Sequence, residues 1–254
     1  MRTLKDVISY ETAPLVQWEP IVGDKPSEGK QLEDSTIHTA VADVLAASGA
    51  MAITGIIADE ARLEVTVAEK IPAAREINHL TLSGVFEQAA RKNVDDAGAN
   101  VRVTSDVDAI APASQDAVVM NMILGCVSTP EDHNNMNKLV QLAESYLREN
   151  GELVIVRPNP EAGTCTTYAC LTPANDLRAG ENYQFTVKGL EEFGAMNNLY
   201  TPDAFLGDLL GKSGFTMGPT VGLTDAFAKA NTPEAKPAFL MNVCKLTKKA
   251  PTFG

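Results

Sequence analysis

The clearest pattern of hydrophobic and polar positions lies between residues 114 and 160. Two short apolar runs, residues 117–124 and 153–156, are typical of buried strands. The amphipathic stretch between them ends at Gly151, which predicts a helix with a glycine stop. Strand, helix and strand in this order form the crossover unit of a parallel sheet, whose ligand sites lie at the carboxyl ends of the strands.

The same kind of reading gives further elements along the chain. They are a small-residue helix at 50–58, a strand at 63–68, a helical region at 71–97 closed by Gly98, a strand at 101–104, a helix from Thr201 to Leu210, and strands at 215–222 and 239–246. The last two strands are expected to pair as an antiparallel hairpin. We therefore expect an α/β fold: a doubly wound, seven-stranded, mostly parallel sheet with an antiparallel C-terminal hairpin.

The chain divides into three regions by composition. Residues 1–36 are rich in proline and aromatic residues and predict an N-terminal helical cap. Residues 37–254 carry the α/β pattern. Within them, residues 160–198 have no clear period and predict an insertion that shapes a substrate pocket.

Charge and cysteine content narrow the class of protein. The 254 residues carry a net charge of −12, which disfavours binding to nucleic acid. No secretory signal or membrane span is visible, so we expect a cytoplasmic protein without a membrane partner. The four cysteines form no C-x-x-C pair, and we expect no metal site. The sequence allows either a homo-oligomer or a hetero-oligomer.

Four segments resemble the class I S-adenosylmethionine-dependent methyltransferases. Residues 100–106 resemble the third strand with its trailing acid, and residues 115–124 resemble the fourth strand. Residues 147–155 resemble the stretch that leads into the fifth strand, and residues 199–215 resemble the last helix with its Gly-Phe turn. The resemblance implies the Rossmann-like methyltransferase fold and S-adenosylmethionine as cofactor.

The first strand departs from that pattern. In the family it ends D/E-x-G-x-G-x-G, and the best match here runs from Asp43 to Gly49, with Leu45 and Ala47 in place of two glycines. This register makes residues 63–68 the second strand, followed by Glu69. An alternative register makes residues 63–68 the first strand and ends the second at 81–83. The first register is favoured because it supplies an acid after the second strand.

The resemblance implies a cofactor site along the first four strands. Its expected residues follow strand ends: Asp43, Ala46, Ala47, Ser48 and Gly49, then Glu69, then Asp106 and Val107, and finally Asn121. In this scheme Glu69 accepts hydrogen bonds from the ribose hydroxyls, and Asp106 with the Val107 N–H reads the adenine. Asn121 lies beneath the sulfonium. The competing interpretations are a surface carboxylate for Glu69, a helix cap for Asp106 and a strand-end amide for Asn121.

Acceptor chemistry has fewer markers. His133 follows the fourth strand and is the candidate base, its competing interpretation being a histidine at a helix start. Arg157 follows the fifth strand and is a candidate ligand for an acceptor carboxylate, or a surface ion pair. Tyr10 and Trp18 of the N-terminal cap are candidates for an aromatic lid over the acceptor.

These observations predict an enzyme that transfers a methyl group from S-adenosylmethionine to oxygen or nitrogen of a small-molecule acceptor. The alternative is a catalytically degenerate or repurposed member of the fold that acts as a partner subunit, because the glycine motif is altered. A nicotinamide-dependent oxidoreductase is disfavoured, since the chain lacks G-x-G-x-x-G.

Overall fold

The computed structural model describes residues 2–8, 28–56, 60–165, 167–224 and 236–247, with the backbone alone for residues 28–35. Tyr10 and Trp18 lie outside these residues. Of the helices described, none is both long enough and apolar enough to cross a membrane.

The main sheet has seven strands in the order β3-β2-β1-β4-β5-β10-β9. The strands are β1 (Ala52–Ile56), β2 (Glu76–Leu80), β3 (Arg102–Thr104), β4 (Gln115–Asn121), β5 (Leu147–Pro158), β9 (Phe215–Leu223) and β10 (Phe239–Leu246). The first five are parallel, and β10 pairs antiparallel with both β5 and β9. The predicted doubly wound sheet with its antiparallel hairpin is confirmed.

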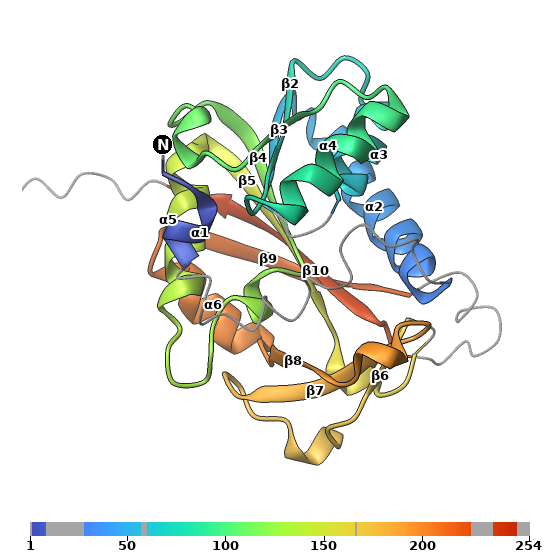
Figure 1. Ribbon diagram of the computed structural model, residues 1–254. Coiled ribbons are helices and arrows are strands. Elements are labelled where there is room, and N and C mark those ends of the chain that lie inside the picture. The colour runs from blue at the N-terminus through green and yellow to red at the C-terminus, as the bar shows by residue number, and fades with distance from the viewer. Residues whose placement is uncertain (1, 9–27, 57–59, 166, 225–235, 248–254) are drawn as a thin grey trace, which may run out of the picture.

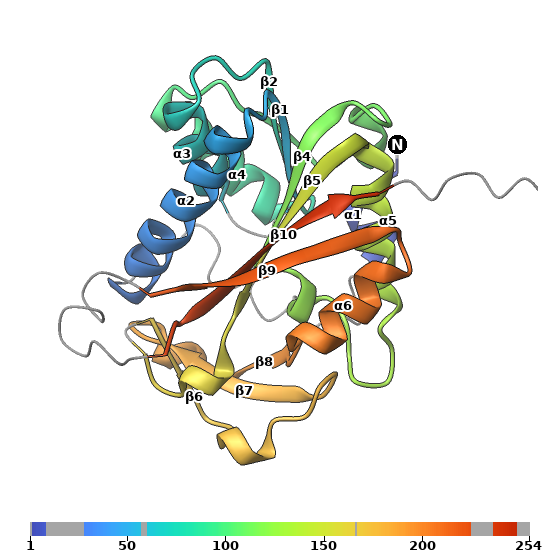
Figure 2. The same cartoon turned by 180° about the vertical axis from the view of Figure 1, so that it is seen from behind.

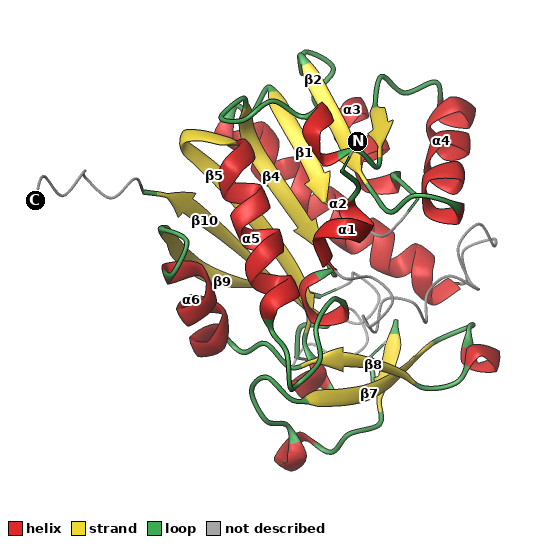
Figure 3. Cartoon of the chain, turned by 60° about the vertical axis from the view of Figure 1, so that its left-hand side comes forward, coloured by secondary structure: helices red, strands yellow, loops and turns green. Residues whose placement is uncertain are grey.

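Helices cover both faces of this sheet (Figures 1 and 2). They are α1 (Leu4–Ile8), α2 (Glu28–Ser48), α3 (Arg62–Lys70), α4 (Val85–Ala97), α5 (Asn134–Tyr146) and α6 (Asp203–Gly211). Figure 3 shows α1 and α5 in front of the strands and α2 behind them. Accordingly the buried side chains form two large clusters, one with α1, α5 and α6 and one with α2 and α3. The α2 helix runs through residue 36, where the sequence had placed the end of an N-terminal cap.

A second, antiparallel sheet lies between β5 and α6 in sequence. Its strands are β6 (Tyr168–Cys170), β7 (Asn182–Val187) and β8 (Met196–Leu199), in that spatial order. Figure 3 shows this sheet beyond the carboxyl ends of the parallel strands β1 and β4. It forms within the stretch predicted as an insertion, and it lies at the end of the sheet where ligands bind in folds of this kind.

Both predicted registers of the first strand are wrong. Residues 63–68 belong to helix α3, and residues 43–48 belong to helix α2. The first strand is β1, in the stretch predicted as a small-residue helix, and the second is β2, inside the predicted helical region 71–97. In α3, Leu63 and Val67 are buried at helical spacing, so packing decided the structure against the strand-like alternation.

The helix before β5 also ends earlier than predicted. It stops at Tyr146, and Gly151 lies within β5. Asn150 adopts a positive φ of 62°, so it takes the left-handed conformation expected of the glycine beside it. By contrast, Gly98 closes α4 with φ 60°, as predicted.

The N-terminal helix α1 packs on a face of the main sheet that the connection from β3 to β4 leaves uncovered. The connection from β3 to β4, residues 105–114, contains only the short turn Val107–Ala109. Leu4 and Ile8 are fully buried in the same cluster as Val118 of β4. Burial of two aliphatic side chains contributes about 3–6 kcal/mol, so α1 is an integral part of the core.

Gly125 marks a close approach between the loop after β4 and the second sheet. It lies in the turn Leu124–Cys126, and a Cβ at this position would lie 2.7 Å from Asn198 Cγ and 3.0 Å from the Leu199 carbonyl oxygen. Both neighbours belong to β8 and are buried. The contact fixes the second sheet against the carboxyl end of β4.

We predict that Gly125→Ala lowers the free energy of unfolding by about 1–3 kcal/mol, because β8 must move to admit the methyl group. Gly207→Ala in α6 is the matched control: its nearest neighbour is Met217 Cε at 4.0 Å, so it is expected to be neutral or stabilising by about 0.5–1 kcal/mol. Urea unfolding of both variants measures the difference. Equal stability of Gly125→Ala and the parent protein would contradict the close approach.

Candidate functional site

The carboxyl end of β1 is flanked by two buried polar side chains. Thr81 follows β2 directly, and Asn121 ends β4, the other neighbour of β1. Thr81 Oγ1 and Asn121 Oδ1 have no hydrogen-bond partner within the described part of the chain, although the side chains are only 0% and 5% exposed. They lie two strand spacings apart, about 10 Å. Because an unsatisfied buried oxygen is costly, the pair indicates a site for a polar ligand at this crevice.

The backbone next to Asn121 is strained. Met122 adopts a φ of 59°, which a bulky side chain rarely tolerates. Its N–H donates to the Val156 carbonyl oxygen of β5 at 2.9 Å, which holds this conformation. Such outliers gather at functional sites, in agreement with the unsatisfied oxygen of Asn121 beside it.

The loop after β1 lacks the expected glycines. Residues 56–61 read Ile-Ile-Ala-Asp-Glu-Ala, and residues 80–83 after β2 read Leu-Thr-Leu-Ser, without a carboxylate. Ala61, at the start of α3, takes the left-handed conformation with φ 61°, which glycine adopts at lower cost. The methionine and ribose sides of the crevice therefore depart from the pattern that the family resemblance implies.

Asp106 and Val107 do follow the third strand, as predicted. Asp106 caps the turn after β3, because its Oδ1 accepts from the Asp108 N–H at 3.1 Å. The Val107 N–H, expected to read adenine, donates to the Arg2 carbonyl oxygen at 2.9 Å. Thr3 and Asp106 form an antiparallel bridge beside it. The N-terminal segment thus occupies the backbone donor at this position.

The other predicted cofactor residues lie at the opposite end of the sheet. Since α2 leads into the start of β1 and α3 runs back from its end, the last turns of both helices lie near the amino ends of the strands (Figure 2). Asp43 pairs there with Lys70 at 2.7 Å, with both side chains about half exposed. The residues displaced in this way are Asp43, Ala46, Ala47, Ser48, Gly49 and Glu69. The strand register that assigned them to a cofactor loop is the error.

Glu69 has a different setting from the one predicted. It lines a groove of about 330 Å³ between α2, α3 and α4 on the helical face. The other lining residues are His38, Thr39, Arg62, Val65, Thr66 and Asn93. Glu69 is exposed on helix α3, so it is a surface carboxylate rather than a strand-end group.

His133 lies directly before α5 and contacts two other elements. Its Nε2 lies 3.3 Å from the Gly180 carbonyl oxygen, and its ring meets Phe205 of α6 edge-on at 5.2 Å between centroids. These contacts join α5, the loop before β7 and α6. They agree with the interpretation of His133 as a helix-start residue, and its catalytic role stays a prediction.

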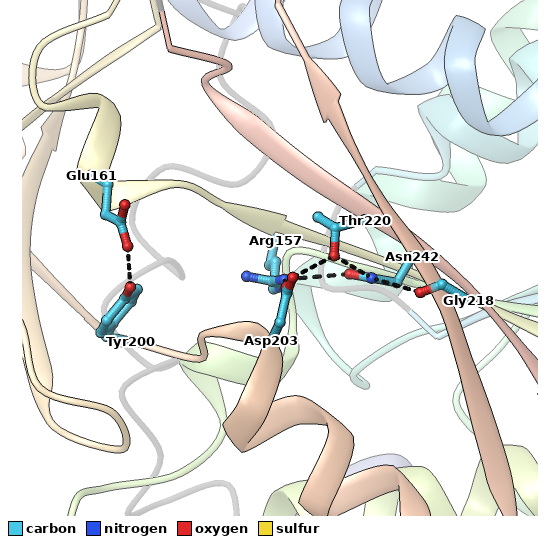
Figure 4. A network of polar contacts seen from close by, with 7 residues as sticks. All are labelled: Arg157, Glu161, Tyr200, Asp203, Gly218, Thr220 and Asn242. Carbon is cyan, nitrogen blue, oxygen red and sulfur yellow. Dashed lines mark hydrogen bonds and ion pairs between the residues drawn. The ribbon is translucent and has the colours of Figure 1, made fainter.

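Arg157 is the centre of a polar network at the carboxyl end of β5 (Figure 4). It is 4% exposed, forms an ion pair with Asp203 at the start of α6, and lies 3.4 Å from Asn242 Oδ1 of β10. Thr220 donates to Asp203 at 2.7 Å and accepts from Asn242 at 2.8 Å. Burial lowers the pKa of Arg157, and the adjacent Asp203 carboxylate opposes that shift.

Tyr200 and Glu161 form a second polar pair near Arg157 (Figure 4). The Tyr200 hydroxyl donates to Glu161 Oε1. Burial, followed by this bond, raises the pKa of Tyr200 to about 12. The sequence analysis missed both residues, as well as the role of Asp203. Their only signal was position, since Asn159-Pro160-Glu161 follows the fifth strand and Tyr200-Thr201-Pro202-Asp203 opens the last helix.

The described residues contain no group of three or more His, Cys, Asp or Glu side chains placed to hold a metal ion. Two of the four cysteines, Cys126 and Cys244, are buried, and burial raises the pKa of Cys244 to about 12.

No protein-family model and no curated protein matches the chain. Solved structures do match its fold. The CcbJ methyltransferase from Streptomyces caelestis has a TM-score of 0.60 at 12% identity, over 94% of this chain and 99% of that one. A 1,6-didemethyltoxoflavin-N1-methyltransferase from Burkholderia thailandensis has a TM-score of 0.58 at 12% identity, over 94% and 90%.

A third match is an S-adenosylmethionine-dependent methyltransferase from Clostridium acetobutylicum, with a TM-score of 0.53 at 11% identity, over 84% of this chain and 92% of that one. At such identities the likeness concerns the fold. The fold is that of the class I S-adenosylmethionine-dependent methyltransferases.

We predict that Asp203→Asn lowers the free energy of unfolding by about 1–2 kcal/mol. The change leaves the buried Arg157 charge without its carboxylate, and the half exposure of Asp203 keeps the cost below the ~3–5 kcal/mol of a fully buried pair. Asp208→Asn, an exposed position on the same helix, is the control and should stay within about 0.5 kcal/mol. Thermal or urea unfolding compares the two, and equal effects would contradict the structural role of the ion pair.

Proposed function

We propose that this protein transfers a methyl group from S-adenosylmethionine to a small-molecule acceptor. The observation that carries the proposal is the pair of unsatisfied buried oxygens, Thr81 Oγ1 and Asn121 Oδ1, on either side of the end of β1. In doubly wound sheets this switch point between two strands is the ligand crevice. The Burkholderia match, whose structure contains 1,6-didemethyltoxoflavin and S-adenosylhomocysteine, supports a small-molecule acceptor.

The polar groups at the crevice suit the cofactor in part. Thr81 and Asn121 offer oxygens for its ribose and amino-acid portions, and Asp106 offers a carboxylate at the adenine end. When bound, the cofactor supplies an electrophilic methyl group. The protein's own part is to hold the acceptor in line and to exclude water, because this kind of transfer depends chiefly on positioning.

The acceptor side is formed by different elements. The second sheet lies beyond the strand ends. His133 contacts the Gly180 carbonyl in the loop before β7, and Arg157 lies near Tyr200, which follows β8. We infer that the acceptor binds between these groups and the end of β4. Whether oxygen or nitrogen receives the methyl group depends on the acceptor that this surface admits.

A second candidate function is that of a degenerate, non-methylating partner subunit. Two observations favour it. The loop after β1 has no glycine to allow close approach of the cofactor, and the Val107 N–H is already bonded to Arg2. Both lie in the cofactor half of the site, so binding of the cofactor distinguishes the two functions.

We predict that the protein binds S-adenosylhomocysteine in a calorimetric titration, and that Asp106→Asn weakens binding about tenfold. The asparagine can still accept the Asp108 N–H, so the turn is kept while the charge is lost. Asp108→Asn is the matched control: Asp108 lies in the same turn and is exposed, so this variant should bind S-adenosylhomocysteine like the parent protein. Absence of any binding by the parent protein would favour the degenerate partner subunit instead.

The N-terminal segment gives an independent prediction. A chain that begins Met-Leu4, with Met in place of Thr3, lacks the Arg2 carbonyl and frees the Val107 N–H, while Leu4 and Ile8 keep α1 packed. We expect its affinity for S-adenosylhomocysteine to rise about threefold to tenfold, which is the value of one hydrogen bond. The full-length Thr3→Met variant is the matched control. Equal affinity of the two chains would show that Arg2 does not compete with the ligand.

A further inference from the structure

The Arg157 network leaves a buried arginine with a donor, Nε, that has no partner within the described part of the chain. Both hydrogen bonds of Arg157 within the described part of the chain are made by Nη2, to Asp203 and Asn242. The Nε group is buried and makes none, and Nη1 also makes none within these residues, although Arg157 is only 4% exposed. Figure 4 shows the guanidinium lying between Asp203 and the Tyr200–Glu161 pair. A buried donor without a partner at this position points to a ligand atom that accepts.

The Tyr200–Glu161 pair offers the opposite kind of group. Because the Tyr200 proton is donated to Glu161 Oε1, the remaining lone pairs of the Tyr200 oxygen and of Glu161 can only accept. Tyr200 stays protonated at neutral pH, since its pKa is raised to about 12. Tyr200 and Arg157 are close enough that each shifts the pKa of the other. Donor and acceptor groups therefore lie near one another in this network (Figure 4).

The charges select against both charged kinds of ligand. Asp203 already neutralises the charge of Arg157, so a ligand carboxylate would gain little from it. The Glu161 carboxylate would also repel a ligand carboxylate. The positive charge of Arg157 would repel a ligand ammonium group. Lys236 Nζ lies 4.0 Å from Glu161 Oε2 and is largely exposed, so solvent screens it and it changes this balance little. A neutral group is favoured.

We propose that Arg157, Tyr200 and Glu161 form an acceptor-recognition subsite for a neutral amide-like edge, a ring N–H beside a carbonyl oxygen. The ligand carbonyl accepts from Arg157, and the ligand N–H donates to Tyr200 and Glu161. That the ligand is the methyl acceptor rests on the proposed methyl transfer. The binding of an amide-like edge is independent of that proposal, because it depends only on these three side chains.

The experiment uses the full-length protein and three fragment probes of one ring each. 2-Pyridone carries both the N–H and the carbonyl, N-methyl-2-pyridone keeps the carbonyl and lacks the N–H, and benzoate carries a charge. Ligand-observed NMR titration is expected to rank 2-pyridone first, with N-methyl-2-pyridone weaker by about tenfold and benzoate weaker still.

Two variants test which residues read the N–H. Tyr200→Phe keeps the ring and removes the hydroxyl, and Glu161→Ala removes an exposed carboxylate. Each is expected to bring the two pyridones to within about twofold of each other. Glu181→Ala removes an equally exposed carboxylate, from the residue whose carbonyl accepts from the Tyr200 N–H, and should keep the tenfold preference.

Three outcomes overturn the subsite: no preference for 2-pyridone in the parent protein, tighter binding of benzoate, or an equal loss of preference in Glu181→Ala. The titration with S-adenosylhomocysteine separates this inference from the proposed function. If that ligand does not bind but the pyridone ranking holds, methyl transfer fails and the subsite stands. If it binds and the ranking fails, only the subsite is wrong.

Discussion

The short connection between β3 and β4 is the constraint on which the packing around the carboxyl ends of β3 and β4 depends. Ten residues carry the chain back along the sheet with a single turn, too little to cover β1 and β4. The face would expose Val118 and its neighbours unless another element packed there, and α1 does so through Leu4 and Ile8. Covering the sheet in this way brings the Arg2 carbonyl onto the Val107 N–H. The packing of α1 on the sheet thus leaves the Val107 N–H bonded within the protein and not open to a ligand.

A second dependence links α6 to the sheet. The helix begins at Asp203, whose carboxylate binds Arg157 of β5 and accepts from Thr220 of β9. Asn242 of β10 completes the contact between these elements. The start of α6 is thereby fixed at the carboxyl end of β5, and Tyr200, three residues earlier, is held beside Glu161. The same ion pair that orders the last helix also sets the polarity of the network at the carboxyl end of β5.

The two halves of the chain differ in how far sequence could predict them. From β4 onward, alternating apolar runs, the Thr201-Pro202-Asp203 helix start and the final hairpin gave the fold, because those elements pack as their patterns suggest. The first half misled: Val65 and Val67 look like a strand but lie in α3, and the five buried residues of β1 look like a helix. Short apolar runs carry no period of their own, so only the completed sheet distinguishes them.

Site residues divided at the third strand instead, since those from β3 onward were placed at the expected strand ends. Asp106, Val107, Asn121 and Arg157 were placed correctly at strand ends, whereas Asp43 and Glu69 moved with the mistaken register. Thr81, Glu161 and Tyr200 could not be selected from sequence, because a lone threonine or a Tyr–Glu pair separated by thirty-nine positions has no local signature. Their significance depends on burial and on partners that tertiary structure supplies.

The unsatisfied oxygens weigh on the choice between enzyme and degenerate subunit. A buried hydroxyl or amide oxygen without a partner costs about 1–3 kcal/mol, and valine or leucine at Thr81 or Asn121 would avoid that cost. Two such groups lie on either side of one strand end, beside a residue with positive φ. Their combined cost is a large fraction of a typical free energy of unfolding of 5–15 kcal/mol. A polar ligand bound at this crevice, as proposed, offers hydrogen bonds to these oxygens, whereas a protein that binds nothing there keeps their cost. The two oxygens therefore support the proposed binding of a polar ligand over the degenerate subunit, despite the altered loop after β1.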